Sequence, residues 1–144
     1  MILPDVNVFV YAFRKDLDRH TQYKKWLENA LAHEPTFGFS EIVLSSFIRI
    51  VTHPKIFVKP SSLEEAFGFI DFIRSRRNSV AVTSGTRHWS IFSELCKKVD
   101  AKGNLITDAY LAAIAIENGC EWITTDRDFA RFPGFRWRHP LKSD

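Results

Sequence analysis

The segment 105–116 constrains the fold of this chain more than any other stretch. Drawn as a helix it is apolar on every side, and helices of that kind are buried. Gly119 follows it closely, at a position where helices commonly end. One carboxylate, Asp108, lies near the start of this helix. Because burying an unpaired carboxylate costs several kcal/mol, Asp108 must be hydrated, hydrogen-bonded or close to a cation.

Length and composition favour a single cytoplasmic domain. A chain of 144 residues most simply forms one domain over residues 1–144, and its 13 Phe and 4 Trp are too many for a disordered protein. No apolar run is long enough to span a bilayer, and residues 1–5 lack the features of a signal peptide. The net charge of +3 permits a phosphate-rich partner without requiring one. Cys96 and Cys120 have no metal-ligand spacing, so we expect two buried thiols.

Short apolar runs alternate with amphipathic segments, and this alternation predicts an α/β fold. The expected strands are 1–3, 36–39, 80–82, 122–124 and 135–137. The expected helices are 8–13, 20–32, 41–51, 63–73, 89–99 and 105–116. Because crossovers between parallel strands are right-handed, such a chain forms a small, mainly parallel sheet flanked by helices on both faces.

Local signals support several of these elements. The run 8–13 fits a strand or a helix, and a helix is favoured because Asp5 or Asn7 can cap it. Ser61 and Ser62 each have a glutamate three places on, which is the capping-box spacing. We expect 80–82 to be buried and Trp89 to belong to the inward stripe of its helix.

Several carboxylates follow predicted strands. Asp5 follows the first strand, Glu41 the strand 36–39, and Asp126 the strand 122–124. In a parallel α/β sheet, ligands bind beyond the carboxyl ends of the strands, so these acids are expected to converge. The helix that begins near Asp108 can bring this acid to the same edge, and Asp128 lies two residues past Asp126.

Each acid has a simpler interpretation when taken alone. Asp5 can cap a helix, Glu41 can be stabilised by a helix dipole, and Asp126 can form a turn. Taken together, carboxylates at one edge repel each other unless they are protonated or bridged by a cation. A hard divalent cation, Mg²⁺ or Mn²⁺, fits such oxygen ligands best.

Other kinds of site are poorly supported. The five histidines are scattered and are interpreted as surface or core residues rather than zinc ligands: His20, His33, His53, His88 and His139. The chain has no nucleophile elbow, Walker loop or dinucleotide-binding glycine motif. Carboxylates with a divalent cation most often serve phosphate-ester hydrolysis, with water as the nucleophile.

The order of the acids resembles that of PIN-domain nucleases, particularly the VapC-type toxins of bacterial toxin–antitoxin pairs. The matching segments are 4–12, 40–41 with 49–57, 107–109 with 111–115, and 124–129 with 132–134. The resemblance implies a PIN (Rossmann-like) fold and a Mg²⁺- or Mn²⁺-dependent ribonuclease. It also implies a homodimer and a cognate antitoxin whose tail lies over the acidic pocket.

By the same resemblance, residue roles can be carried onto this chain. The acidic metal site would be made by Asp5, Glu41, Asp108 and Asp126. Asn7 would orient Asp5, Asp128 would support the metal or its water, and Thr125 would hydrogen-bond within the site. Val6 departs from the family, which commonly has a small hydroxyl residue after the first acid.

Basic residues are expected around an acidic site that handles RNA. Three clusters could contact phosphates or be solvated helix ends: Arg74 with Arg76 and Arg77; Lys97 with Lys98 and Lys102; and Arg136 to His139 around Trp137. Arg127 could neutralise a neighbouring acid or contact a phosphate. The alternative to a nuclease is a non-catalytic RNA-binding or interaction module on this fold, which would be expected to have lost one or more acids.

Overall fold

Five short strands form one parallel sheet at the centre of the molecule. The structure is a computed structural model that describes residues 1–142. The strands are β1 (Ile2–Pro4), β2 (Phe37–Phe39), β3 (Ser79–Ala81), β4 (Glu121–Ile123) and β5 (Trp137–Arg138). Their order is β3-β2-β1-β4-β5, and every neighbouring pair is parallel. The predicted parallel α/β sheet is therefore confirmed. The prediction of one domain over 1–144 also includes residues 143–144, which lie outside the described part.

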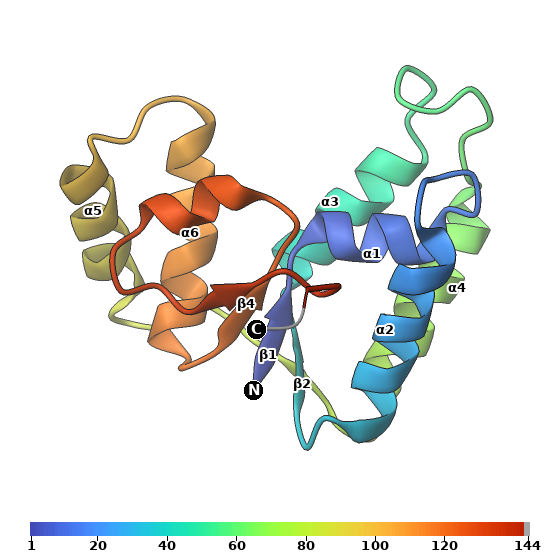
Figure 1. Ribbon diagram of the computed structural model, residues 1–144, viewed down its shortest axis with the longest axis horizontal. Coiled ribbons are helices and arrows are strands. Elements are labelled where there is room, and N and C mark those ends of the chain that lie inside the picture. Colours follow the sequence, from blue (N-terminus) through green and yellow to red (C-terminus); the bar gives the residue numbers. More distant parts are fainter. Residues whose placement is uncertain (143–144) are drawn as a thin grey trace.

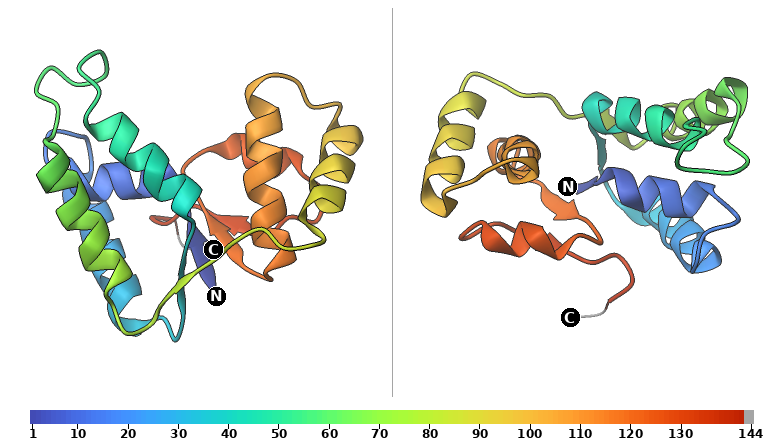
Figure 2. Two further views of the ribbon diagram at one scale, coloured as in Figure 1. Left: turned by 180° about the vertical axis from the view of Figure 1, so that it is seen from behind. Right: turned by 90° about the horizontal axis from the view of Figure 1, so that it is seen from above.

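Helices connect the strands and gather in two groups on either side of β1. The helices are α1 (Val6–Phe13), α2 (His20–His33), α3 (Glu41–Val51), α4 (Leu63–Arg74), α5 (His88–Val99), α6 (Asn104–Glu117) and a short 3₁₀ helix, η1 (Arg127–Arg131). Figures 1 and 2 show α1 to α4 on one side, with α5, α6 and η1 on the other. This division places the start of α1 and the end of β4 at the middle of the molecule.

The central strand β1 ends one residue later than its proline suggests. It pairs with β4 over three residues, and Pro4 lies opposite Ile123. The next backbone N–H, that of Asp5, donates to the Ile123 carbonyl at 2.8 Å. Pairing with β2 involves Ile2 and Phe37. Proline is tolerated at the end of this central strand because the N–H it lacks would face β2, whose pairing with β1 is limited to Ile2 and Phe37, while the Asp5 N–H continues the pairing with β4.

Two expectations about burial are wrong. The strand β3 lies at the edge of the sheet, and its Val80 is 44% exposed. Trp89 does not face the core and is 70% exposed. An edge strand is covered on fewer sides than a central one, and amphipathic spacing alone does not say which face of a helix meets a neighbour. The apolar residue that does enter the core next to β3 is Val82.

The helix α6 is buried along most of its surface but not on every side. Its alanines and Ile114 face the core, whereas Ile106 and Ile116 are exposed. Cys120 is buried as expected, but Cys96 is partly exposed. Within residues 1–142, no helix is both long enough and apolar enough to cross a bilayer.

Candidate active site and metal centre

Three carboxylates meet beside the start of α6. Asp108 lies early in α6, Asp126 caps η1, and Asp128 lies in the first turn of η1. One carboxylate oxygen from each lies within 4.8 Å of the others. The Asp128 N–H donates to Oδ1 of Asp126 at 2.9 Å, so the backbone turn holds these two acids together. Asp128 thus lies within the carboxylate cluster itself, and its supporting role toward a metal stays a prediction.

Asp5 is the buried acid of the group. It caps α1, and its Oδ1 accepts the Val6 N–H at 2.7 Å. Its Oδ2 accepts the Thr124 hydroxyl at 2.7 Å. The pKa of Asp5 is raised to about 6, chiefly by burial and to a smaller extent by the negative charge of Asp126, against the lowering effect of these two hydrogen bonds.

Thr124 joins two of the acids and was missed at the sequence level. Its hydroxyl donates to Asp5 and accepts the Asp126 N–H at 3.0 Å. The side chain is fully buried at the end of β4. A signal was present, since Thr124 is the residue at the carboxyl end of a predicted strand, where ligand-binding side chains gather. In this chain the residue after Asp5 is Val6, which has no hydroxyl, and the hydroxyl that bonds to Asp5 comes from Thr124 instead.

The side chain of Asn7 lies close to the backbone of Thr125. The described side-chain hydrogen bonds of Asp5 go to Val6 and Thr124, and the orienting role of Asn7 stays a prediction. The Asn7 Oδ1 lies 3.5 Å from the Thr125 N–H, at the limit of a hydrogen bond. Asn7 therefore helps to position the loop that carries Asp126.

The charges of three neighbouring aspartates affect the pKa of Asp108. Its pKa is raised to about 6, first by burial and then by the charges of Asp126, Asp5 and Asp128 in that order. The four acids therefore interact through their charges, although only Asp108, Asp126 and Asp128 have carboxylate oxygens within 4.8 Å of one another. The donor set is made of carboxylate oxygens alone, and it fits Mg²⁺ or Mn²⁺.

Glu41 is not brought into this group. It opens α3, as predicted, but its side chain is 64% exposed and its Oε2 lies 2.7 Å from Nη1 of Arg74. The Arg74 guanidinium also lies 5.1 Å from the centre of the Phe39 ring. Glu41 and Arg74 line a groove between α3 and α4 with a volume of about 490 Å³. The metal-binding role of Glu41 stays a prediction.

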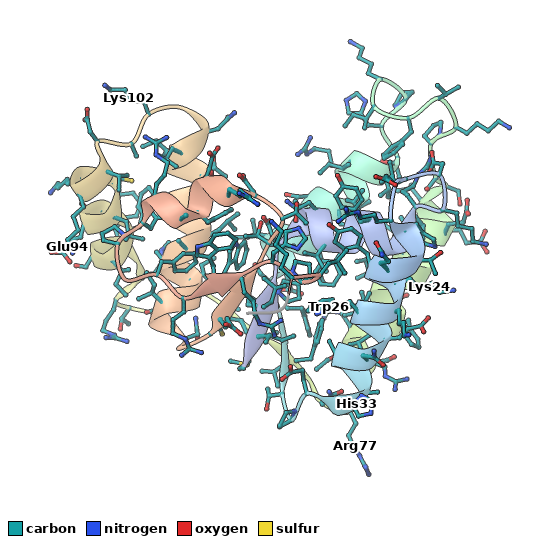
Figure 3. All side chains as sticks on the ribbon, in the orientation of Figure 1. Lys24, Trp26, His33, Arg77, Glu94 and Lys102 are labelled. Atoms are coloured by element: carbon teal, nitrogen blue, oxygen red, sulfur yellow. The ribbon has the colours of Figure 1, made fainter. Side chains whose placement is uncertain are left out.

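The predicted basic clusters are not all placed around the acids. Arg76 and Arg77 precede β3, so they lie at the amino edge of the sheet, away from the acids at the carboxyl edge, and Figure 3 shows Arg77 near His33. Arg138 pairs with Glu121 at 3.0 Å. Lys102 lies in the loop that leads into α6, where Figure 3 labels it. Arg127 is exposed and pairs with no acid within residues 1–142.

A family model described as "PIN domain" matches residues 2–134 of this chain. This chain belongs to the PIN-domain family. Ribonuclease VapC43 from Mycobacterium tuberculosis is 43% identical over 141 residues, which cover 98% of this chain and 96% of that protein. Ribonuclease VapC25 from the same bacterium is 38% identical over 140 residues, covering 97% and 99%. The PIN domain described here is therefore of the VapC type, as its motifs suggested.

Solved structures share the fold of this PIN domain. A crystal structure of VapBC2 from Rickettsia felis, bound to a DNA fragment from its promoter, contains a chain that matches with a TM-score of 0.69. The two chains are 23% identical, and the match covers 96% of this chain and 98% of the other. The PIN (Rossmann-like) fold is thereby confirmed.

Proposed function

We propose that this VapC-type protein is a Mg²⁺- or Mn²⁺-dependent endoribonuclease that hydrolyses RNA phosphodiester bonds and acts as the toxin of a VapBC-type pair. The names of its relatives support ribonuclease activity. The single observation that carries the proposal is the meeting of Asp108, Asp126 and Asp128, with Asp5 tied to Asp126 through Thr124. A non-catalytic module has no need for four acids held at the cost of mutual repulsion.

In this proposal each residue has a defined task. Asp5, Asp108 and Asp126 would hold the cation, with Asp128 beside them, and the family resemblance adds Glu41. When bound there, a divalent cation would lower the pKa of water and neutralise charge on the scissile phosphate. Thr124 fixes the Asp5 carboxylate and the backbone at Asp126, so two distant parts of the chain present their acids together.

The VapC relationship also suggests partners and a location. VapBC2 of Rickettsia felis, whose fold this chain shares, is described as a VapBC assembly, which supports a cognate antitoxin as a partner. A homodimer and a cytoplasmic location, both expected from the sequence, belong to the same proposal. Exposed apolar side chains on α4, including Leu63, Phe67 and Phe72, offer a surface for either protein partner.

The first test is cleavage of mixed cellular RNA by the purified protein. We expect discrete cuts with Mg²⁺ or Mn²⁺ that disappear with EDTA and in the Asp5→Asn variant. Glu94→Gln is a matched control, because Glu94 lies exposed on α5, away from the acids (Figure 3). Binding of RNA without cleavage under either metal would contradict the proposal and favour the non-catalytic module.

A further inference from the structure

The loop between α3 and α4 (residues 52–62), here named the α3–α4 arm, has a fixed shape without being helix or strand. At its base, the Ser61 N–H donates to the Val51 carbonyl at 2.8 Å. Within it, the Phe57 N–H donates to the His53 carbonyl at 3.1 Å, and the Lys55 N–H lies 3.1 Å from Nδ1 of His53. These contacts define the path of the arm, which rises beyond the end of α3 in Figure 1.

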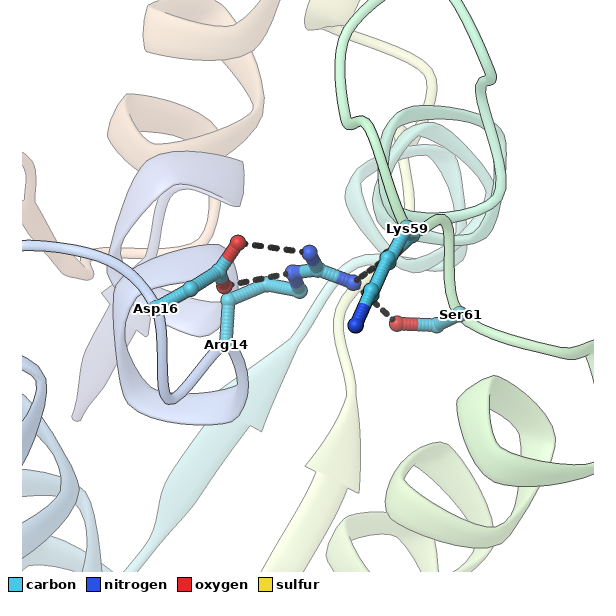
Figure 4. Close-up of polar contacts among 4 residues, drawn as sticks. All are labelled: Arg14, Asp16, Lys59 and Ser61. Carbon is cyan, nitrogen blue, oxygen red and sulfur yellow. Dashed lines mark hydrogen bonds and ion pairs between the residues drawn. The ribbon is translucent and has the colours of Figure 1, made fainter.

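Arg14, at the C-terminal end of α1, holds the arm through several polar contacts (Figure 4). Its Nε and Nη2 donate to the two carboxylate oxygens of Asp16 at 2.9 and 2.7 Å. Its Nη1 donates to the Lys59 carbonyl at 2.8 Å and to the Ser61 hydroxyl at 2.9 Å. Its guanidinium lies 4.0 Å from the centre of the Phe57 ring. A buried arginine is costly unless its donors are paired, so this network favours one conformation of the arm.

The two helices that begin at predicted site acids, α1 and α3, end beside the arm. Asp5 caps the start of α1 and Glu41 opens α3, while the arm is held at the far ends of both helices. With its eight residues, α1 is about 12 Å long. Arg14 therefore holds the arm at a set distance, roughly one short helix, from Asp5. The loop with Lys102 rises on the opposite side of the molecule (Figure 3).

The outer surface of the arm carries two exposed lysines and two aliphatic side chains, and its phenylalanine is buried. Lys55 and Lys59 are exposed, and residues 52–62 include no acid. Neither lysine pairs with an acid within the described residues. Phe57 is buried under Arg14, so it cannot stack on a base, while Ile56 is 51% and Val58 is 99% exposed.

We infer that the α3–α4 arm binds the RNA backbone, with Lys55 and Lys59 contacting phosphates outside the cleavage site and without regard to sequence. This inference rests on the proposed ribonuclease function. Lysine is depleted at protein–protein interfaces but common at phosphate contacts. A few exposed aliphatic residues, here Ile56 and Val58, are normal on protein surfaces and do not by themselves indicate a protein partner.

The test measures RNA binding by fluorescence anisotropy, with labelled oligouridylate and oligoadenylate in Mg²⁺. All proteins compared carry Asp108→Asn, so that the RNA is not cleaved. Losing two phosphate contacts from a single strand should lower the slope of log affinity against log salt by about 1.4 and weaken binding roughly 10- to 30-fold at about 0.1 M salt. We expect this for Lys55→Ala/Lys59→Ala with both homopolymers. The matched control is Lys24→Ala/Lys25→Ala on α2, which should bind like the background (Figure 3).

Three outcomes would overturn the inference. They are unchanged affinity and salt slope in the arm variant, a loss confined to one homopolymer, and unchanged RNA binding together with a changed oligomeric mass. The last would make the arm a protein-binding surface. If the unmutated protein cleaves no RNA with any metal while the arm variant still loses RNA affinity, the proposed function fails and the arm assignment stands.

Discussion

At the scale of single residues, the hydroxyl of Thr124 has two partners that a methyl group could not serve. It donates to Asp5 and accepts the Asp126 N–H. Thr124→Val keeps the shape but removes both hydrogen bonds. Because groups that orient metal ligands typically contribute 10- to 100-fold to metal affinity, we expect Mn²⁺ affinity to fall by about that factor.

The measurement is Mn²⁺ titration by calorimetry, with RNA cleavage in parallel. Thr124→Ser retains the hydroxyl and should restore most of the metal affinity, whereas a purely packing role would leave Thr124→Ser impaired and Thr124→Val intact. Wild-type affinity in Thr124→Val would remove Thr124 from the proposed site.

Asp108 contributes a pH dependence to stability whose sign follows from its raised pKa. The carboxyl has a pKa of 3.8 when unperturbed and about 6 in the folded protein, so the folded state holds the proton more tightly. The stability that Asp108 contributes is therefore present below about pH 4 and is lost as the pH rises through about 6. Because Asp108 is partly exposed, solvent screening reduces the effect to about 1–2 kcal/mol.

Replacing Asp108 by Asn should therefore stabilise the metal-free protein at neutral pH and leave it nearly unchanged at about pH 4. Thermal melting in EDTA across this range measures the difference. The same variant should lose RNA cleavage and growth inhibition. Equal melting temperatures for the two proteins at neutral pH would contradict the repulsion among the acids, and full cleavage activity would contradict the site assignment.

The ion pair between Glu41 and Arg74 need not prevent Glu41 from serving the site. Both side chains are substantially exposed, and exposed ion pairs contribute about 0–1 kcal/mol. A bound cation could therefore compete for the Glu41 carboxylate at little cost. This small energy makes the pairing with Arg74 compatible with the role that the family resemblance implies.

At the scale of elements, the attachment of the α3–α4 arm to α1 depends on Arg14. Arg14→Met keeps much of the stem that covers Phe57 but loses the bonds to Lys59 and Ser61. Losing such hydrogen bonds should destabilise the protein by about 1–3 kcal/mol and loosen the arm.

Limited proteolysis with trypsin measures that loosening. Cleavage after Lys55 should become faster in Arg14→Met, while the bond after Lys59 is protected by Pro60 in both proteins. Arg49→Met is a suitable control, because Arg49 is exposed on α3 and lines the groove away from this network. Equal cleavage rates in the variant and the unmutated protein would mean that Arg14 does not hold the arm.

Several elements could be predicted from local pattern, and others could not. The helices 20–33 and 41–51 and the capping box of Ser62 and Glu65 agree with periodicity and capping signals. Local pattern failed for the exposure of Trp89 and Val80, because exposure depends on which neighbour covers a given face. Sheet order is likewise a long-range property, since Ile2 pairs with residues far along the chain.

At the scale of the whole molecule, a cation bound among the acids should stabilise the fold. A ligand at about 100 times its dissociation constant contributes about 2.7 kcal/mol, or roughly 5–10 °C in melting temperature for a domain of this size. We expect Mn²⁺ to raise the melting temperature, EDTA to reverse the rise, and Asp126→Asn to abolish it. Potassium chloride at matched ionic strength controls for screening, and an equal rise with it would argue against a specific site.

The sequence alone determined the kind of fold and the kind of chemistry. Alternating apolar runs and helical stripes are local properties, and they predict a parallel α/β sheet. Acids that follow strands gather at one sheet edge, so Asp5 and Asp126 could be chosen before their geometry was known, and the apolar helix that begins near Asp108 added the third acid. The motif order then added the VapC resemblance, which the relatives confirm.

Tertiary structure decided which side chains meet. Thr124 bonds to Asp5 across 119 positions of sequence, and Glu41 turns to Arg74 on another helix. The need for glycine at position 38 is also a tertiary property, because a Cβ there would lie 2.8 Å from the Ile2 carbonyl oxygen on the neighbouring strand. Such contacts depend on how distant segments approach each other, and no local pattern records that approach.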